Sequence, residues 1–344
     1  MTVRFCIVGA GRIGTVHGRS IAACEAAELV AISDPDSTAA AALAQRHGAE
    51  VRSMEAAAAA TDTDAVIICS PTDLHAEHVE LFSRAGKAVF CEKPISLAPH
   101  RVRQCLDIVK AAGTLLWVGF NRRFDPHFMA VKAAIDEGRI GQPEMGLIIS
   151  RDPSAPPAEY IRRSGGIFRD MMIHDLDMAV FLLGDLPAFI QASASVLTDA
   201  GIATLGDYDS ATALLTWADG RQLTISNSRR ASYGYDQRIE IHGSTGMVSA
   251  ENQRPVDIRV ARAEGILQPP LHDFFMTRYA AAYSNELAAF IAAVEGRASD
   301  LSIGSIPDGR AGLNALLLAE AALEAATTGA RISLEKDLGG HSAG

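Results

Sequence analysis

Three ionisable residues in the segment 169–178 have the types and spacing that proton transfer requires. If this segment is a helix, Asp170, His174 and Asp177 fall within about 60° of one another, because successive residues turn by about 100°. An aspartate one turn before a histidine can orient the imidazole and raise its basicity, which suits a general base that removes a hydroxyl proton. A solvated polar helix face would give the same pattern, so both interpretations stay open.

A second group of this kind is Glu92-Lys93-Pro94, which follows the apolar run 88–91. In doubly wound sheets, ligands bind at the carboxyl ends of the strands. A lysine there, beside a proline that fixes the local turn, can polarise a substrate hydroxyl through its positive charge. Glu92 could hold the lysine side chain. The alternative is an exposed Glu-Lys pair at the end of a strand.

The sequence Gly9-Ala10-Gly11-Arg12-Ile13-Gly14 matches G-x-G-x-x-G where an apolar run ends and a helical pattern begins. The first glycine permits a tight turn, the second lets the backbone approach a pyrophosphate, and the third allows close helix–strand packing. The anion would lie at the helix N-terminus. Asp34, at the end of the second apolar run, has the position of a carboxylate that binds ribose hydroxyls. This order predicts a dinucleotide-binding site.

The residues around Asp34 favour NAD over NADP as the cofactor. Pro35 and Asp36 follow it, and no arginine or lysine occurs between Asp34 and Arg46. A ribose 2′-phosphate would therefore meet negative charge without a cationic clamp. Arg12 is the one residue of the glycine loop that could lie over the adenosine and tolerate a phosphate.

The elements that would position these residues change character along the chain. Short apolar runs alternate with helical patterns up to residue 119, which predicts a doubly wound parallel sheet. Beyond it the strands alternate, and turn sequences at 219–220 and 243–246 predict a mostly antiparallel sheet. Two alanine-rich helices, near 279–293 and 307–326, follow. We expect an α/β protein with a first domain at 1–119, a second domain at 120–335 and a flexible tail at 336–344.

Composition and charge exclude several classes of protein. A length of 344 residues corresponds to about two domains, and 48% hydrophobic with 21% charged residues is typical of folded proteins. The net charge of −10 and the lack of a basic run make nucleic acids and anionic membranes poor partners. No apolar stretch approaches the roughly 18 residues of a membrane-spanning helix, and no signal-peptide pattern precedes the first strand. We expect a cytoplasmic protein.

The sequence does not favour a metal site or a redox-active cysteine pair. Five cysteines occur without a C-x-x-C pair, and we expect them to be reduced residues of the core. His174 and Asp177 have a spacing that could bind a metal ion, but no further histidine or cysteine cluster supports one.

The glycine loop, Glu92-Lys93-Pro94, Gly165-Gly166 and Asp170-x-x-x-His174-Asp175 together resemble the Gfo/Idh/MocA oxidoreductase family over nearly the whole chain. This resemblance implies an NAD-binding Rossmann domain at 1–119. It also implies a substrate-binding and oligomerisation domain at 120–335, whose large, mostly antiparallel sheet often forms the subunit interface of dimers or tetramers.

Three further segments, 119–125, 150–153 and 233–236, are most similar to those of myo-inositol 2-dehydrogenases within this family. The resemblance implies NAD-dependent oxidation of myo-inositol to 2-keto-myo-inositol. In the family's mechanism His174 would remove the hydroxyl proton, Asp170 would orient His174, and Lys93 would stabilise the developing alkoxide. The expected substrate-binding residues are Lys93, Arg123, Asp170, His174 and Tyr233. The expected cofactor-binding residues are Gly9, Gly11, Arg12, Ile13, Asp34, Ser70, Pro71, His75, Glu92 and Lys93.

Three alternatives remain open at this point. The substrate could be another inositol isomer, an aldose or a sugar acid, because residue types do not reveal the stereochemistry of a polyol pocket. The chain could bind a dinucleotide and partner proteins without turnover, in which case the catalytic trio would be incomplete. A tightly held cofactor could serve an internal redox cycle between two sugars.

Overall fold

The computed structural model describes residues 2–297 and 306–334, and its contacts divide the chain into two compact units. Unit 1 comprises Met1–Phe124 and Ala282–Leu316, and unit 2 comprises Asp125–Ala281 and Leu317–Gly344. The sequence predicted one boundary near residue 119, with both alanine-rich helices in the second domain. The structure assigns 282–316 to unit 1, because apolar side chains of this segment join the core of the first sheet. The expected tail, 336–344, lies outside the described residues.

Unit 1 contains a six-stranded parallel sheet with the order β3-β2-β1-β4-β5-β6. The strands are β1 (Val3–Val8), β2 (Ala27–Ser33), β3 (Glu50–Val51), β4 (Ala65–Ile68), β5 (Ala88–Glu92) and β6 (Leu116–Gly119). The apolar residues of β1, β4, β5 and β6 are mostly buried, as in other parallel sheets that helices cover, whereas the edge strand β3 is exposed. The predicted doubly wound sheet is confirmed, and its strand order reverses between β1 and β4, where such sheets bind ligands.

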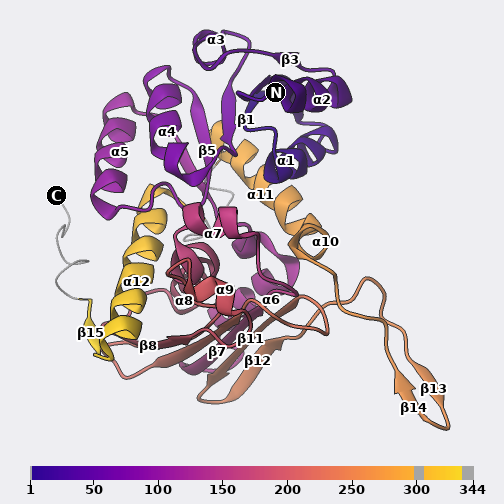
Figure 1. The fold of residues 1–344 in the computed structure, drawn as a ribbon, viewed down its shortest axis with the longest axis vertical. Helices are drawn as coiled ribbons and strands as arrows, with labels where there is room; N and C mark the ends of the chain where they lie inside the picture. The colour runs from indigo at the N-terminus through magenta and orange to yellow at the C-terminus, as the bar shows by residue number, and fades with distance from the viewer. Residues whose placement is uncertain (1, 298–305, 335–344) are drawn as a thin grey trace. The chain divides into compact units, whose positions relative to one another are not determined.

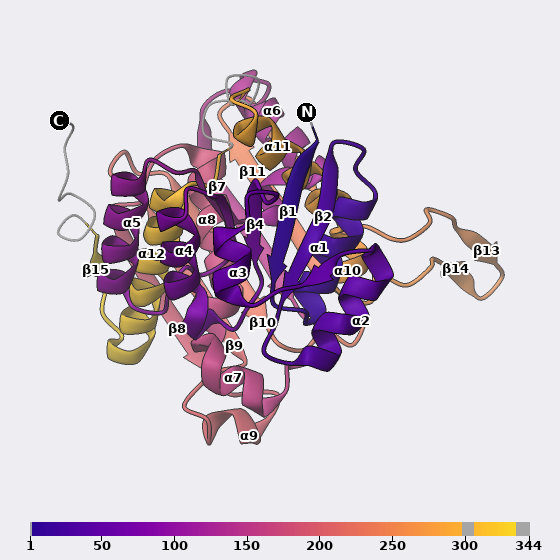
Figure 2. The same ribbon diagram turned by 90° about the horizontal axis from the view of Figure 1, so that it is seen from above.

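Helices connect these strands along both faces of the sheet (Figures 1 and 2). Asp36 begins one of them, since its side chain accepts the backbone N–H groups of Thr38 and Ala39, and Gly48 ends it with a φ of +71°. The helices of unit 1 are α1 (Arg12–Ala22), α2 (Ser37–His47), α3 (Met54–Ala59), α4 (His75–Arg84), α5 (Pro99–Ala112), most of α11 (Ala280–Val294), and the short 3₁₀ turns η1 (Thr72–Leu74) and η2 (Asn121–Phe124).

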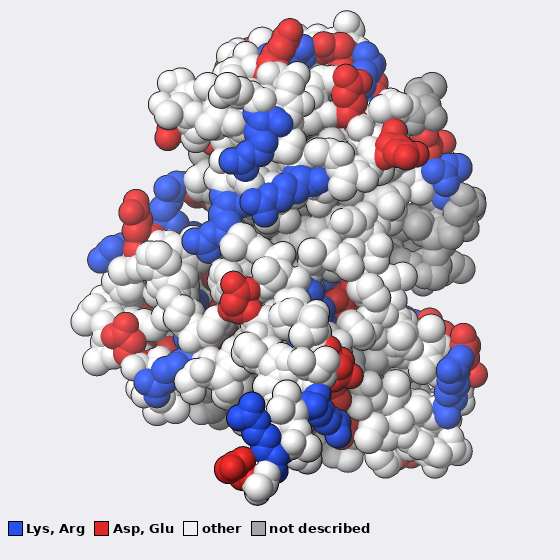
Figure 3. Space-filling view, turned by 90° about the vertical axis from the view of Figure 1, so that its right-hand side faces the viewer, with Lys and Arg blue, Asp and Glu red and all other residues white. Residues whose placement is uncertain are grey.

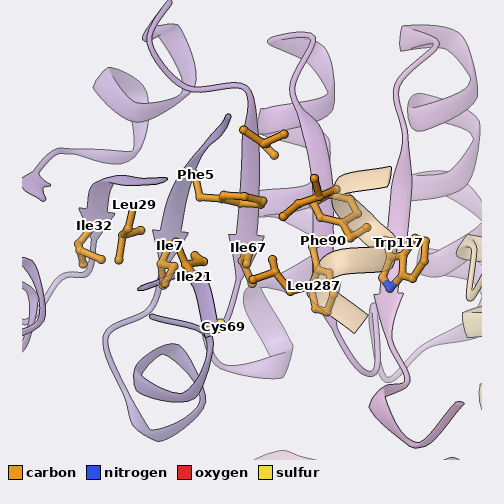
Figure 4. Close-up of a cluster of buried hydrophobic side chains, with 14 of the residues drawn as sticks. Phe5, Ile7, Ile21, Leu29, Ile32, Ile67, Cys69, Phe90, Trp117 and Leu287 are labelled. Carbon is orange, nitrogen blue, oxygen red and sulfur yellow. The ribbon is translucent and has the colours of Figure 1, made fainter. Parts of the chain in front are cut away.

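The core of unit 1 is formed by side chains of neighbouring strands and of α11 (Figure 4). The ring of Phe290 lies 5.5 Å from that of Phe90, 5.8 Å from that of Trp117 and 6.2 Å from that of Phe5, measured between centroids. Leu287, one turn earlier on α11, is also buried there. Burial of each such side chain contributes about 1.5–3 kcal/mol, which explains why α11 folds with the first sheet although it follows the second in sequence.

Unit 2 contains a seven-stranded sheet with the order β12-β11-β7-β10-β9-β8-β15. Only the pair β7 and β10 is parallel, so the predicted mostly antiparallel sheet is confirmed. The predicted turns at 219–220 and 243–246 join β9 to β10 and β11 to β12. The strands are β7 (Pro143–Arg151), β8 (Phe189–Ser195), β9 (Ser210–Thr216), β10 (Gln222–Ser228), β11 (Asp236–Gly243), β12 (Gly246–Ala250) and β15 (Ile332–Ser333).

The remaining elements of unit 2 are helices and one projecting hairpin. The hairpin of β13 (Val260–Arg262) and β14 (Gly265–Leu267) extends away from the sheet of its own unit (Figure 1). The helices are α6 (Pro126–Asp136), α7 (Ala158–Ser164), α8 (Ile173–Leu183), α9 (Ala200–Ala203), α10 (Phe275–Arg278) and the C-terminal part of α12 (Gly309–Thr328). A π-helix, η3 (Phe168–Met172), runs directly into α8.

The cysteines are free thiols, and four of the five are buried; Cys24 is partly exposed. Burial raises the pKa of the Cys6 and Cys105 thiols to about 12, so both stay protonated and unreactive at neutral pH. None of the helices in the described ranges has the length and apolar character of a membrane span. Basic and acidic side chains are interspersed on the face shown in Figure 3.

Candidate active site

The glycine loop of unit 1, residues 9–14, has close backbone contacts at its first and last glycines and open space around the middle one. A Cβ atom on Gly9, whose φ is +102°, would lie 2.6 Å from the Cys69 carbonyl, and one on Gly14 would lie 2.0 Å from the Gly9 carbonyl oxygen. A Cβ on Gly11 would meet nothing within 4 Å. Helix α1 begins directly after Gly11, at the exposed Arg12. The loop therefore fits a pyrophosphate that approaches Gly11 and the N-terminus of α1.

Asp34 lies beside this loop, directly after β2. Its Oδ2 accepts the backbone N–H of Ala10 at 2.6 Å, and its Oδ1 accepts that of Asp36 at 2.8 Å. An ionised carboxylate has about four acceptor sites, so Asp34 retains capacity for ribose hydroxyls. The carboxylate has the position that the sequence predicted, and its contact with Ala10 additionally holds the glycine loop.

Two more loops of unit 1 meet the same edge of the sheet, because β1, β4 and β5 are neighbours in a parallel sheet. Ser70 and Pro71 follow β4, and Lys93 follows β5. The peptide bond between Lys93 and Pro94 is cis. Gly9, Asp34, Ser70 and Lys93 therefore all belong to the carboxyl edge of one sheet, where a dinucleotide binds in folds of this type.

His75 connects the loops after β4 and β5. Its Nδ1 lies 2.7 Å from the Pro94 carbonyl oxygen and its Nε2 lies 2.7 Å from the Ser70 carbonyl oxygen, and the ring is buried. Desolvation by burial lowers the pKa of His75, while the two carbonyl groups oppose this effect. Both ring nitrogens thus contact backbone of the loops that carry Ser70 and Lys93, so His75 shapes the expected cofactor site through these loops.

Glu92 pairs with a residue that sequence reasoning missed. Its Oε1 lies 2.7 Å from Nε2 of the buried His17 on α1. The His17 ring packs edge-on against Phe90 and Tyr283 at centroid distances of 5.1 and 5.5 Å. The sequence suggested that Glu92 holds its neighbour Lys93. The contact with His17 connects the end of β5 to the helix that follows the glycine loop, and no spacing pattern links residues 75 positions apart.

Arg123 is the last of the expected site residues in unit 1. It lies in η2, directly after β6, and its side chain is buried. The guanidinium carbon lies 5.9 Å from the centroid of the Phe120 ring. This arrangement is a cation–π contact that fixes the side chain at the end of the sheet.

In unit 2, the segment with Asp170 and His174 differs from the regular helix that the sequence predicted. Asp170 lies in the π-helix η3, and His174 lies in the first turn of α8. The three ionisable residues differ in burial, so they do not form one solvated helix face. Asp170 and His174 are partly exposed, whereas Asp177 is buried.

Asp170 contacts two residues that the sequence did not suggest. The hydroxyl of Tyr160, on α7, donates to its Oδ1 at 2.8 Å. On the other side, Nη2 of the buried Arg229 lies 4.0 Å from its Oδ2. Arg229 also lies 3.2 Å from Oδ2 of Asp207. The carboxylate of Asp170 is therefore flanked by a hydroxyl donor and a buried positive charge.

The adjacent Asp175 anchors α8 to the sheet. Its Oδ1 accepts from Ser150 Oγ at 2.6 Å and its Oδ2 accepts from Asn227 Nδ2 at 2.7 Å, on β7 and β10 respectively. The side chain is fully buried, so these hydrogen bonds compensate for its desolvation. The contacts hold the first turn of α8, which carries His174, against β7 and β10.

Tyr233 lies in the segment between β10 and β11 of unit 2. Its hydroxyl donates to Asp236 Oδ2 at 2.6 Å and accepts from Arg151 Nη1 at 3.1 Å. Burial and Asp236 raise its pKa. It lines a cavity of about 350 Å³ with Arg151, Arg230 and several serines of β8, β9 and β10. Neither Asp170 nor His174 lines this cavity, but Asn227 does, and it donates to the carboxylate of Asp175, the neighbour of His174. No cluster of three or more metal-binding side chains occurs within 2–297 and 306–334.

Comparison with known proteins identifies the family. Residues 3–120 match the oxidoreductase family with an NAD-binding Rossmann fold, and residues 128–249 match the Gfo/Idh/MocA C-terminal domain. An inositol 2-dehydrogenase from Rhizobium meliloti is 58% identical over 97% of this chain and all of that protein.

Solved structures agree with this match. The structure of a myo-inositol dehydrogenase from Corynebacterium glutamicum has a TM-score of 0.91 and 41% identity, and the match covers 97% of this chain and 99% of the other. That of a scyllo-inositol dehydrogenase from Lactobacillus casei, with bound NAD(H) and scyllo-inositol, has a TM-score of 0.88 and 29% identity, with the same coverage. The chain belongs to the Gfo/Idh/MocA family of NAD-binding oxidoreductases.

Proposed function

We propose that this chain is an inositol 2-dehydrogenase, which oxidises myo-inositol to 2-keto-myo-inositol with NAD⁺. The observation that carries this proposal is the 58% identity, over nearly the full length, to an inositol 2-dehydrogenase. The family resemblance gives catalytic roles to three residues that are all present in this chain. Lys93 follows β5, Asp170 lies in η3 and His174 lies in α8.

The reaction removes a proton and a hydride from one carbinol group. The bound nicotinamide supplies the hydride acceptor. His174 accepts the hydroxyl proton as general base, and Asp170 orients the His174 ring. Lys93 stabilises the negative charge that develops on the substrate oxygen as the proton leaves. Arg123 and Tyr233 are proposed to contact the other hydroxyl groups of the polyol.

NAD rather than NADP is the proposed cofactor because of the charges around Asp34. The Asp34 carboxylate lies beside the glycine loop, next to the backbone N–H of Ala10. A 2′-phosphate on the ribose would approach this negative charge, whereas a free 2′-hydroxyl would donate to it. The cofactor contacts are proposed to come from Gly9, Gly11, Arg12, Ile13, Asp34, Ser70, Pro71, His75, Glu92 and Lys93, with His75 acting through the backbone of Ser70 and Pro94.

The enzyme is proposed to be a homo-oligomer. The β13–β14 hairpin exposes apolar side chains that its own unit leaves uncovered, among them Val260, Ile266 and Leu267. An isolated two-stranded hairpin is marginal in water, so contact with a second copy would stabilise it. Sedimentation or light scattering would show a dimer or tetramer, and a monomer at micromolar concentration would contradict this part of the proposal.

Purified protein, myo-inositol and NAD⁺ at alkaline pH provide the direct test. We expect reduced cofactor to form at a rate that saturates with both substrates, and more slowly with NADP⁺. scyllo-Inositol and glucose serve as parallel substrates, because a site that hydrogen-bonds one arrangement of hydroxyl groups rejects others strongly. Turnover of scyllo-inositol alone would favour the activity of the Lactobacillus casei neighbour. No turnover with any inositol would contradict the proposal.

A further inference from the structure

Arg229 is a buried arginine that the reaction as described leaves without a role. It directly follows β10, and its side chain is only 1% exposed. Its backbone N–H donates to the Asp209 carbonyl at 2.8 Å, and the Asp209 carboxylate accepts three backbone N–H groups between residues 197 and 199. The segment that carries Arg229 is therefore fixed to the loop between β8 and β9.

The guanidinium of Arg229 lies between two carboxylates. Its Nη2 is 3.2 Å from Asp207 Oδ2 and 4.0 Å from Asp170 Oδ2. A buried charge without a counter-charge would cost several kcal/mol, so these two neighbours account for the presence of an arginine at this place. Neither Nη2 nor Nε of Arg229 makes a hydrogen bond to the part of the chain that the structure describes. The interaction is therefore one between charges rather than a bidentate fork.

Asp207 connects Arg229 to the backbone that carries Asp170. Its Oδ1 accepts the backbone N–H of Ile167 at 2.9 Å, directly before η3. Gly166, with a φ of +81°, makes room for this carboxylate, since a Cβ atom there would lie 2.5 Å from Asp207 Oδ1. Glycine at position 166 thus has a structural reason, because it lets Asp207 reach the start of the π-helix.

We propose that Arg229, held by Asp207, is a positioning residue that fixes the orientation of the Asp170 carboxylate and places a buried positive charge beside it. This inference rests on the proposed function, in which Asp170 orients His174. Further titratable groups of this neighbourhood include Tyr160, which donates to Asp170, and His174 in the next turn. Arg169 is directed to Glu320 on α12 and pairs with it.

The proposal predicts the direction in which the pH profile moves. Replacing Arg229 by glutamine removes a positive charge, which favours proton uptake at both Asp170 and His174. Both protonated forms are inactive in base catalysis. We expect Arg229→Gln to lower kcat by about 10- to 100-fold near neutral pH and to move the acid limb of the kcat/KM profile to higher pH, with partial recovery at alkaline pH.

Two conservative variants should affect the acid limb of the kcat/KM profile differently from Arg229→Gln: one should leave it in place and the other should move it in the opposite direction. Arg229→Lys keeps the charge, and because no bidentate fork is lost, we expect most of the activity and the wild-type acid limb. Asp207→Asn keeps an oxygen that accepts the Ile167 N–H. It removes the negative charge that competes with Asp170 for the guanidinium of Arg229. We expect it to move the acid limb to lower pH. Arg221→Gln removes an ion-paired arginine near the opposite end of β10 and is the matched control, with an unchanged profile.

The measurements are pH profiles of kcat/KM and kcat on the wild type and these four variants, with NADH binding and melting temperature as checks of folding. If wild-type protein does not oxidise any inositol, the proposed function has failed. If the wild type is active and folded Arg229→Gln and Asp207→Asn retain its acid limb, the positioning role is wrong. Should Arg229→Gln not fold, the opposed predictions for Arg229→Lys and Asp207→Asn still decide.

Discussion

The two segments that carry the proposed catalytic groups are held in place by different kinds of contact. The lysine segment, residues 92–94 in unit 1, is held by the neutral backbone carbonyl of Pro94, which contacts His75, and by the contact of Glu92 with His17. The acid–histidine segment, residues 166–174 in unit 2, is held by the buried charges of Asp207 and Arg229.

This difference in contacts follows from the secondary structure of the two segments. The lysine segment ends a strand of a parallel sheet, so neighbouring loops lie beside it and can bind its backbone. The acid–histidine segment contains a π-helix, whose geometry is uncommon in helices and requires specific support. We therefore expect the lysine segment to respond to the protonation of a histidine, and the acid–histidine segment to respond to the loss of fixed charges.

The largest effect is expected from removal of the base on the acid–histidine segment. His174→Ala should lower kcat by about 10²-fold or more, because general bases contribute 10²- to 10⁴-fold. The binding of NADH should be almost unchanged, since the glycine loop and Asp34 belong to unit 1. Steady-state kinetics and NADH titration measure the two quantities separately.

His127→Ala is a matched control for this variant, because His127 is an exposed histidine of the same unit, on α6. It should retain wild-type turnover. A His174→Ala enzyme with near-normal kcat would remove the base assignment, and one that fails to bind NADH would show that the two segments are not independent.

A second prediction tests whether the glycines of the expected cofactor loop have separate roles in folding and in NAD binding. Gly9→Ala should destabilise the protein by about 1–3 kcal/mol, because φ is +102° and the new Cβ would meet the Cys69 carbonyl. Gly11→Ala has open space around the new methyl group. It should melt near the wild-type temperature and yet bind NAD more weakly, because the methyl group would occupy the approach of the pyrophosphate. Equal melting temperatures for the two variants would contradict this account.

Most of the first sheet could be predicted from the sequence. Each of its strands except the two-residue β3 is an apolar run between helical patterns, and such a signal is local. The assignment of α11 could not. This helix is rich in alanine and apolar over much of its surface, so its pattern does not say which sheet it packs against. Its place is decided by Phe290, whose ring meets three aromatic residues from β1, β5 and β6.

The candidate site shows the same division between local and distant signals. Gly9, Asp34 and Lys93 could be found because each stands at the end of an apolar run, and the structure places them at one edge of a sheet. Arg229 and Asp207 could not, because they lie 59 and 37 positions after Asp170 in the printed sequence and belong to loops without a motif. The burial of Asp177 could not be predicted either, because helical spacing alone does not show which face of a helix packs against the rest of its unit.

The smallest expected effect concerns His75 and acid stability. Burial places the pKa of His75 below its ordinary value of 6.5, so the unfolded chain binds a proton more readily than the folded one. The stability from a neutral His75 is therefore complete above about pH 6.5 and is lost as pH falls toward the folded pKa. His75→Gln, which can still donate to one carbonyl, should make the melting temperature less dependent on pH between 7 and 5.

His47, His78 and His272 have lowered pKa values too, so part of the slope should remain. The exposed His100 on α5 is the control, and an equal change of slope in His100→Gln would mean that the lysine segment does not owe its acid sensitivity to His75.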